Sequence, residues 1–374
     1  MVPRVRLSIV LAALTATLVV AGCIPTVLPV SKTLDAEYVV RAAANPAVLA
    51  PTADGRLYYA EKDTGRIRVV VGGVLQDLPV ADVPVNFAGD RGLIGLALHP
   101  DFATNGRIYA FYSRSDTGVD TADPRAIVDH RVVYFDTDGL IATGGEVFVV
   151  SLPAGTEPAR IGGRLLFASD GRLLVALGDL GDEAAVGDDT APNGKMLRYE
   201  ADGSIPDDNP VADSPVYAYG LRDPGGLAHD TLTTAILFTD RQPGSRTELN
   251  RLQAGGHYGW PQVDGLADTD AEQTFAAATL DYQDPLLLTA AGQPRALAGL
   301  SVNPSTRYGP TSLNEAFVGD PALQQIVRMG LDAQRLTVTG EQVFARPLPG
   351  IIRDVAFAPA GTLYVATSTD VFKI

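Results

Sequence analysis

The sequence predicts an all-β fold, a six-bladed β-propeller built from four-stranded antiparallel blades. Two observations indicate it. After residue 35, short runs rich in Val, Ile, Leu, Tyr and Phe alternate with Gly, Asp, Asn and Pro, as strands alternate with turns. The runs also repeat one turn-strand phrase six times, at intervals of about 50 residues, the period typical of propeller blades.

The repeated phrase is an Asp-Gly or similar turn followed by a strand of the type Leu-Tyr-Val-Ala. Asp-Gly supplies the positive φ angles of a tight hairpin, and the alternation that follows buries one face of a strand. A β-sandwich with long insertions is the alternative, but it gives no reason for a repeated phrase. Clear copies begin at Asp54, Asp170 and Ala360, and weaker copies at Asn105, Thr234 and Leu313.

The first residues resemble an export signal. Arg4 and Arg6 precede an uncharged apolar stretch over residues 7–20, which ends on Ala-Gly-Cys at residues 21–23. The stretch is shorter than the roughly 20 residues that span a bilayer, so we expect residues 1–22 to be removed, with an uncleaved membrane anchor as the alternative.

Cys23 is the only cysteine, which excludes an intramolecular disulfide. We expect it to carry acyl chains such as palmitate, and to hold an exported lipoprotein on a membrane of the cell envelope. Residues 23–35 are predicted to be a tether, and residues 36–374 the propeller.

The charge balance excludes one class of partner. The chain has 44 acidic against 29 basic side chains, which disfavours binding to nucleic acid phosphates. Hydrophobic residues make up 46% of the chain, enough for a core.

The most specific phrase of the chain is Gly-Leu-Ile-Gly-Leu-Ala-Leu-His-Pro-Asp-Phe at residues 92–102. Further phrases begin at Gly162, Gly178, Gly194, Tyr219, Glu248 and Gly255. In this order, these phrases resemble the glucose/sorbosone dehydrogenase family, soluble quinoproteins that oxidise sugars with pyrroloquinoline quinone. The Gly-Ser-Ile-Pro phrase at 203–206 and the Tyr-Gly-Trp-Pro phrase at 258–261 are first interpreted as architecture, because they combine turn formers with packing aromatics.

The resemblance implies a quinone over the mouth of the propeller, a calcium ion bridging it to the protein, and a histidine that takes the sugar's hydroxyl proton. That histidine is expected at position 160, which is Arg160. Arginine stays protonated near neutral pH and cannot act as the base. Asp179 matches an aspartate that supports the family's site, Arg222 an arginine that contacts the quinone, and Arg353 one of two neighbouring arginines, the other falling on Ile351.

Two amides of the family's cofactor site are replaced by carboxylates here. Asp90 stands for a glutamine and Asp223 for an asparagine, while an expected lysine falls near Ala322. The quinone is a tricarboxylate, so added carboxylates should weaken its binding unless Arg160 and Arg91 restore the balance. One hypothesis is that Arg160 pairs with Asp90 or Asp223, which would convert a catalytic pocket into a salt-bridged one.

Calcium is expected on a turn whose backbone carbonyls bind the ion. The family's Gly-Pro dipeptide is Gln242-Pro243 here, and carbonyl ligation remains possible because every residue has a backbone oxygen. The acidic stretch between Asp179 and Asp189 lacks a recognisable ligand spacing and is predicted to be a solvated loop. The histidines His99, His130, His229 and His257 are predicted to be structural, with His229 or His257 as a displaced base in the alternative.

Three functions follow. The family activity is oxidation of an aldose or similar alcohol by the quinone. The first alternative is an inactive propeller that binds a carbohydrate, another small polar ligand or a protein at its mouth. The second is a calcium-dependent lactonase or hydrolase on the same scaffold, which no nucleophile or metal cluster in the sequence supports. The sequence leaves the substrate, the electron acceptor and the oligomeric state open.

Overall fold

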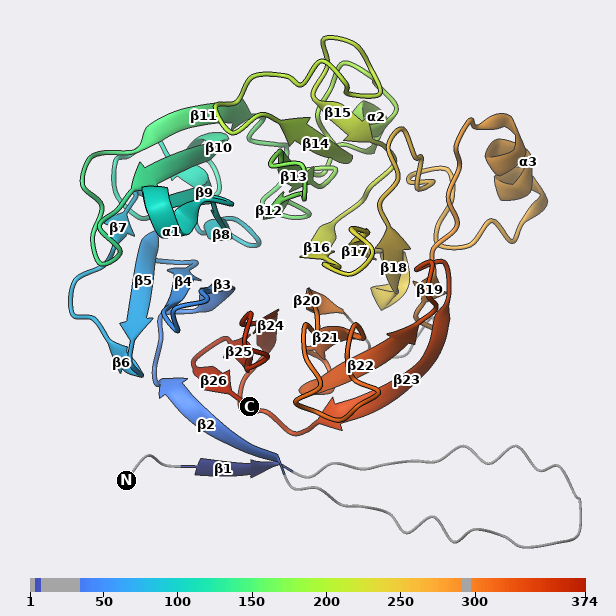
Figure 1. Cartoon of the computed structure of the whole chain (residues 1–374). Coiled ribbons are helices and arrows are strands. Elements are labelled where there is room, and N and C mark those ends of the chain that lie inside the picture. Colours follow the sequence, from blue (N-terminus) through green and yellow to red (C-terminus); the bar gives the residue numbers. More distant parts are fainter. Residues whose placement is uncertain (1–3, 8–33, 291–296) are drawn as a thin grey trace, which may run out of the picture.

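The computed structural model describes residues 4–7, 34–290 and 297–374, and its sheets form a ring around a central axis (Figure 1). The six sheets are the blades, and each winds outward from an inner strand. This arrangement confirms the predicted six-bladed propeller. Of the expected export signal only residues 4–7 are described, and Cys23 lies outside the described residues.

Each blade is a consecutive antiparallel meander except the last, which also takes a strand from the N-terminal end. The first blade comprises β3 (Pro46–Pro51), β4 (Leu57–Glu61), β5 (Arg66–Val71) and β6 (Val74–Leu75), with β7 (Ala81–Asp82) also paired to β5. The second blade comprises β8 (Leu93–Leu98), β9 (Arg107–Ser115), β10 (Ile127–Asp136) and β11 (Val147–Leu152). The third blade comprises β12 (Gly162–Phe167), β13 (Leu173–Leu177), β14 (Lys195–Tyr199) and β15 (Val216–Ala218).

The fourth blade comprises β16 (Pro224–His229), β17 (Ile236–Arg241), β18 (Thr247–Arg251) and β19 (Leu287–Leu288). The fifth blade comprises β20 (Ala298–Val302), β21 (Ala316–Asp320), β22 (Gln325–Leu331) and β23 (Val338–Ala345). The last blade comprises β24 (Ile352–Phe357), β25 (Leu363–Thr367), β26 (Val371–Lys373) and β2 (Leu34–Val40). The short strand β1 (Arg4–Leu7) pairs with β2.

The repeated turn-strand phrase has one position in the architecture. In all six blades it forms the second strand, namely β4, β9, β13, β17, β21 and β25. The turn before this second strand joins it to the inner strand of the same blade. The repeat in the sequence therefore marks the hairpin nearest the axis of the ring.

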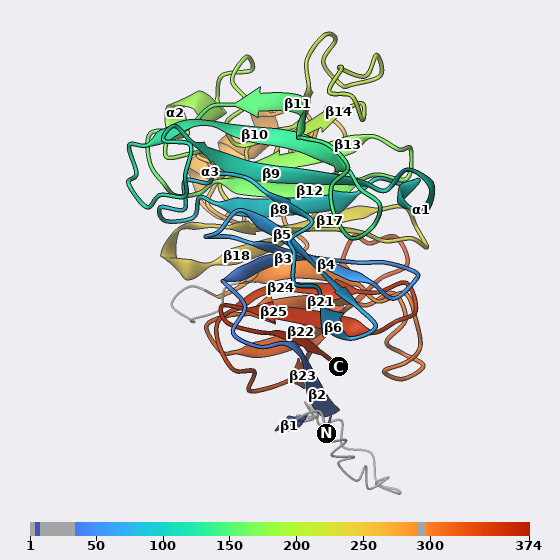
Figure 2. The same ribbon diagram turned by 90° about the vertical axis from the view of Figure 1, so that its left-hand side faces the viewer.

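Both ends of the chain build the last blade. Strand β2 pairs antiparallel with β26, in the register Glu37 to Lys373 and Tyr38 to Phe372. The Lys373 Nζ lies 3.1 Å from the Glu37 Oε2, and Figure 2 shows β2 close to the C-terminus. This pairing closes the ring.

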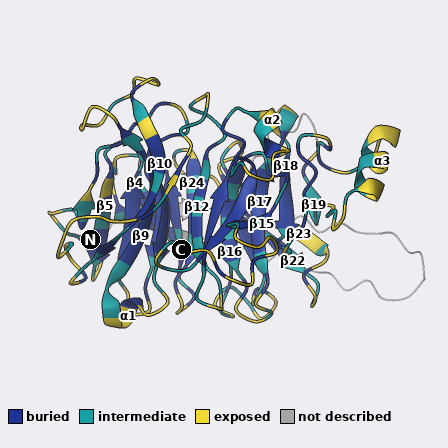
Figure 3. Ribbon diagram, turned by 90° about the horizontal axis from the view of Figure 1, so that it is seen from above, coloured by how far each residue is buried: buried dark blue, intermediate teal, exposed yellow. Residues whose placement is uncertain are grey.

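The core lies between neighbouring blades, and the strands are buried while the connecting loops carry most of the exposed surface (Figure 3). Tyr58 of β4 and Tyr112 of β9, for example, belong to one cluster that joins the first two blades. Burial of such a side chain contributes about 1.5–3 kcal/mol, so the interblade contacts hold the ring together.

Within the described part of the chain, three short α-helices interrupt the sheets, α1 (Phe102–Asn105), α2 (Glu183–Val186) and α3 (Asp270–Ala278), together with one 3-10 turn at Pro243–Ser245. Helix α3 projects from the ring between β18 and β19 (Figure 1), and a capping box of Thr269 and Glu272 fixes its start. Over the residues that the structure describes, none of the helices has the length and apolar character needed to cross a membrane.

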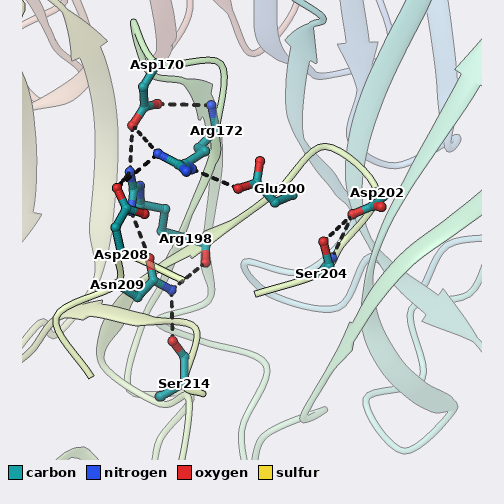
Figure 4. A network of polar contacts seen from close by, with 9 residues as sticks. All are labelled: Asp170, Arg172, Arg198, Glu200, Asp202, Ser204, Asp208, Asn209 and Ser214. Carbon is teal, nitrogen blue, oxygen red and sulfur yellow. Dashed lines mark hydrogen bonds and ion pairs between the residues drawn. The ribbon is translucent and has the colours of Figure 1, made fainter. Parts of the chain in front are cut away.

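A polar network on the third blade shows what the Gly-Ser-Ile-Pro phrase does (Figure 4). Arg198 pairs with Asp170 at 2.6 Å and with Asp208 at 2.9 Å, and Asn209 Nδ2 donates to the Ser214 carbonyl. Ser204 caps the turn by donating its N–H and its hydroxyl to Asp202. The phrase therefore forms the turn after β14, and Asp208 and Asn209, which follow it, fasten the loop between β14 and β15 to Arg198 of the blade.

Candidate functional site

A cavity of about 270 Å³ lies where the inner strands of the six blades begin, and we call it the mouth cavity. Its charged lining consists of Lys62, Asp90, Arg164, Asp223, Arg241 and Arg353, and Ile94, Ile161, Ile351 and Ile352 supply apolar walls. Every blade contributes at least one lining residue, so the ring itself assembles the site.

A second cavity of about 950 Å³, the far cavity, opens where the same strands end. Arg164 of β12 lines both cavities. Its Nη1 lies 3.3 Å from Asp354 Oδ1, and its Nη2 donates to the Arg353 carbonyl at 3.2 Å. This ion pair separates the two cavities on the axis.

Arg160 stands beside the mouth cavity with its side chain turned away from it. Its backbone is left-handed, with φ at 57°, and its N–H donates to Asp90 Oδ2 at 3.2 Å. Its Nε donates to Asp179 Oδ1 at 2.6 Å. Burial lowers the pKa of Arg160, but the hydrogen bond and charge of Asp179 outweigh that effect and leave the pKa raised.

The hypothesis that Arg160 pairs with Asp90 or Asp223 is therefore wrong for the side chain. The reason lies in the backbone, because residue 160 runs alongside the end of β13 and its carbonyl accepts the Leu180 N–H. The carboxylate nearest to its guanidinium is consequently that of Asp179. Only the backbone N–H of Arg160 reaches Asp90.

Asp179 is fully buried and has three donors around it. Besides Arg160, Trp260 Nε1 donates to its Oδ2 at 3.0 Å, and the Gly181 N–H donates to its Oδ1 at 2.9 Å. The Arg222 guanidinium lies over the Trp260 ring, 5.1 Å from its centroid. The Tyr-Gly-Trp-Pro phrase thus reaches the site, a role that its interpretation as architecture missed, although Trp260 is the only tryptophan of the chain.

The carboxylate of Asp223 pairs with Arg241 rather than with Arg160. Arg241 Nη2 lies 2.6 Å from Asp223 and 3.4 Å from Asp90, so one guanidinium bridges two carboxylates. Burial raises the pKa of Asp223 and the charge of Asp90 adds to that effect, while Arg241 opposes it. Arg241 was not singled out in the sequence, because a residue's partner across a ring of blades leaves no local pattern.

Asp240 lies next to the group formed by Asp90, Asp223 and Arg241, and it fixes the backbone at Arg222 and Asp223. Its carboxylate accepts the N–H of Arg222 at 2.9 Å and the N–H of Asp223 at 2.5 Å. Burial raises the pKa of Asp240 to about 7. The side chain of Arg222 points away from the mouth cavity, and its Nη1 donates to the Arg241 carbonyl.

The predicted site residues fall into two groups. Asp90, Asp223 and Arg353 line the mouth cavity, whereas Arg160, Asp179, Arg222, Gln242 and Pro243 do not. Arg91 was considered as a compensating cation, but its guanidinium is buried against the carbonyls of Pro124 and Ala154. Sequence reasoning also missed the lining residues Lys62, Arg164 and Arg241.

The histidines do not supply a base at the mouth. His229 lines the far cavity, and His257 stacks on Tyr219 while its Nδ1 accepts the Gly259 N–H. Burial lowers the pKa of His130 to about 3, and its ring contacts the Ser113 hydroxyl. The mouth lining contains none of these imidazoles, so a displaced histidine base finds no support in the geometry.

The residues at the mouth do not fit pyrroloquinoline quinone well. Two carboxylates, Asp90 and Asp223, face the space where a tricarboxylate would lie, and Arg160 contributes neither a proton acceptor nor a lining charge. Arg164 and Arg241 are already paired with carboxylates, so Arg353 is the one lining arginine that, among the described residues, has no carboxylate partner, against the three carboxylates of the quinone. Like charges at short range disfavour binding of such an anion.

A divalent cation fits the oxygen atoms near the predicted turn better than the turn itself. The Pro243 carbonyl already accepts the Arg246 N–H. Next to it, the buried oxygens Gln242 Oε1, Glu248 Oε1 and Asn250 Oδ1 have no hydrogen-bond partner among the described residues, and such oxygens suit calcium. Over the same residues, no group of three or more His, Cys, Asp and Glu is arranged to hold a metal.

Comparison with known proteins shows which family the chain belongs to. The model of the family described as glucose/sorbosone dehydrogenase matches residues 43–373. An aldose sugar dehydrogenase of Escherichia coli is 28% identical over 315 residues, which cover 81% of this chain and 81% of the relative. A pyrroloquinoline quinone-bound aldose sugar dehydrogenase from Streptomyces coelicolor shares the fold, with 24% identity, a TM-score of 0.73, and coverage of 90% of this chain and 95% of that one.

A relative of another kind matches as well. The Hedgehog-interacting protein of Mus musculus is 28% identical over 230 residues, which cover 53% of this chain and 32% of the relative. Proteins related to this chain thus include some named for sugar oxidation and one named for an interaction. The matched range extends from before β3 to the last strand and includes every inner strand of the ring, so this chain belongs to the glucose/sorbosone dehydrogenase family.

Proposed function

We propose that this member of the family binds a sugar in the mouth cavity without oxidising it by the quinone reaction. The observation that carries the proposal is the Arg160 to Asp179 ion pair. At the position of the expected base it puts a guanidinium, which cannot accept a proton and is held by a buried carboxylate. Proton removal from a sugar hydroxyl therefore lacks its acceptor.

The lining of the mouth cavity suits a small polyhydroxylated ligand. Carboxylates and guanidinium groups together accept and donate hydrogen bonds, as Asp90, Asp223 and Arg241 do here. Isoleucines supply the apolar walls, a combination of apolar surface and few polar groups that is typical of ligand sites. Left-handed non-glycine residues beside the cavity, Arg160 and Leu180, add backbone strain of the kind that clusters at functional sites.

A second candidate, the family's quinone-dependent dehydrogenase, is favoured by one observation. The oxygens of Gln242, Glu248 and Asn250 suit calcium, the ion that the family's reaction uses. In that case these side chains would hold the ion. The quinone would then supply the hydride acceptor, which no side chain of the chain can provide.

We also propose that the propeller is tethered to a membrane of the cell envelope through lipid on Cys23. The support is the apolar stretch that ends in Ala-Gly-Cys. In the structure β2 begins at Leu34, so only a short segment separates that cysteine from the ring. The mouth would therefore work close to the membrane surface.

Calorimetric titration of the purified protein with a panel of monosaccharides tests the proposal. We expect saturable binding of at least one sugar, and no dye reduction when pyrroloquinoline quinone, calcium and the same sugars are supplied together. Sugar-dependent dye reduction by the wild-type chain would contradict the proposal and favour the dehydrogenase. Asp90→Asn should weaken sugar binding, whereas Asp82→Asn, on an exposed edge of the first blade, should not.

A further inference from the structure

We infer that the ligand of the mouth cavity is a sugar acid, a molecule with several hydroxyl groups and one carboxylate, such as an aldonate or a uronate. This inference rests on the proposed function, because it names the ligand class of the same site. It follows from the way charge is distributed over the lining.

The carboxylate pole is the part of the lining formed by Asp90 and Asp223. Both contact one guanidinium, that of Arg241, so the three groups together carry an excess negative charge. Two carboxylates have about eight acceptor positions between them, and a single guanidinium offers five donors. The acceptors that remain at this pole suit hydroxyl groups, which donate hydrogen bonds.

The cationic pole is Arg353, on the inner strand β24. Its carbonyl accepts from Arg164, but among the described residues no carboxylate forms an ion pair with its guanidinium, and its buried Nε has no partner. The nearby Arg164 is already paired with Asp354, so it is less available to a ligand carboxylate than Arg353 is. Arg353 is only partly buried and lines the cavity, so the charge of its guanidinium is available to pair with a ligand carboxylate there.

Lys62, the remaining charged residue of the lining among those that the structure describes, does not change this balance. Lys62 Nζ lies 3.2 Å from Asp63 Oδ1 and donates to the Phe87 carbonyl, so its ammonium group already has partners within the protein. Ile351, with 47% of its surface exposed, adjoins Arg353 and offers an apolar contact to the carbon face of a sugar ring. The carboxylate pole thus matches the hydroxyl groups of the ligand, Ile351 matches its apolar face, and Arg353 matches its carboxylate.

The poles also exclude other ligands of similar size. A molecule with several negative charges would be repelled by the carboxylate pole, and a neutral sugar would leave the charge of Arg353 without a carboxylate partner. A cavity of about 270 Å³ is also small, which favours a single sugar unit over an oligomer.

Calorimetry with matched ligands tests the inference. Galacturonate and galactose differ in one carboxylate, and we expect galacturonate to bind about tenfold more tightly, the factor that corresponds to one charge-assisted hydrogen bond. Arg353→Gln should abolish this preference, since a glutamine keeps a donor but no charge. Arg125→Gln, at an exposed arginine paired with Asp123, is the matched control and should keep the preference.

The outcomes separate the two proposals. Equal binding of both ligands, or a preference that survives Arg353→Gln, overturns the sugar-acid inference and leaves sugar binding at the mouth standing. Absence of binding by either ligand and by the rest of the sugar panel overturns both. Thermal unfolding of each variant shows whether it is folded, and Arg353→Lys, which restores the charge, should recover the preference in part.

Discussion

The Arg160 guanidinium lies 2.6 Å from Asp179, while the backbone N–H of the same residue is hydrogen-bonded to Asp90 at the wall of the mouth cavity. Arg160 thus links a fully buried carboxylate to a solvent-accessible one without lining the cavity itself. Asp179 also receives Trp260 Nε1, so three segments of the third and fourth blades meet at one carboxylate.

We predict that Asp179→Ala destabilises the protein by about 3–5 kcal/mol, because it leaves the half-buried charge of Arg160 and the Trp260 N–H without their acceptor. Urea denaturation followed by tryptophan fluorescence measures the change. Asp82→Ala, which removes an exposed partner of Arg66, should cost less than about 1 kcal/mol. Similar losses for the two variants would contradict a structural role for the buried pair.

We predict that the triple variant Asp90→Gln, Arg160→His and Asp223→Asn gains quinone-dependent sugar oxidation. It restores a proton acceptor and removes the two carboxylates that face the cavity, and a general base alone contributes about a hundredfold or more. Dye reduction with pyrroloquinoline quinone, calcium and an aldose measures the rate. Wild-type activity equal to that of the variant would show that Arg160 does not block the reaction.

The pKa of Asp240 predicts a pH dependence of stability. Burial raises it from 3.8 to about 7, so the folded state binds this proton more tightly than the unfolded state. The stabilising contribution is therefore complete below about pH 4 and is lost as the pH rises toward 7, with a slope of at most about 1.4 kcal/mol per unit for one proton. Urea denaturation of Asp240→Asn at pH 5, 6 and 7 should give a shallower slope than the wild type. Unchanged slopes would rule out Asp240 as the source.

Burial also raises the pKa of Asp223 and of Glu248, so both groups act in the same direction and the wild-type slope is expected to exceed that of one proton. Asp82→Asn, at an exposed aspartate, serves as the control and should leave the slope unchanged.

The fold was predictable because the sequence signals that specify it lie within short segments of the chain. Each Asp-Gly turn and the strand after it, from Leu57 to Leu363, reports one hairpin, and six such hairpins require a ring. The resemblance also assigned Arg160 and Asp179 to one site. The partner of Arg160 did not, because Asp90, Asp179 and Asp223 stand on three different segments and only the three-dimensional path of residue 160 decides among them.

Arg241 and Trp260 were missed for a related reason. Arg241 is the last residue of β17, and its role depends on two carboxylates that are 18 and 151 positions away in the sequence. The indole of Trp260 packs like any core aromatic, and only its single N–H donor marks it as part of the site.

We predict that removal of residues 1–41 lowers the melting temperature, because it deletes β2 and leaves the edge of β26 without its partner strand. A chain that begins at residue 34 should melt at the temperature of the mature protein. Differential scanning calorimetry of the two shortened chains measures the difference. Equal melting temperatures would show that β2 does not stabilise the ring.

We predict that Cys23→Ser moves the protein from the membrane fraction to the soluble fraction, since stable anchoring requires the acyl chains that this thiol would carry. Fractionation of cells followed by immunoblotting measures the distribution. Unchanged membrane association would contradict a lipid anchor at this residue.

The pairing of β2 with β26 also governs the order of events during synthesis. A contact between residues 37 and 373 has nearly the largest sequence separation that the chain allows, and such contacts form slowly. Until the C-terminal strand has left the ribosome, the other blades stand as an open arc with an unsatisfied edge at each end. We therefore expect the nascent protein to need a chaperone until its final residues arrive, and mutations in the last strand to cause aggregation rather than a stable, partly folded product.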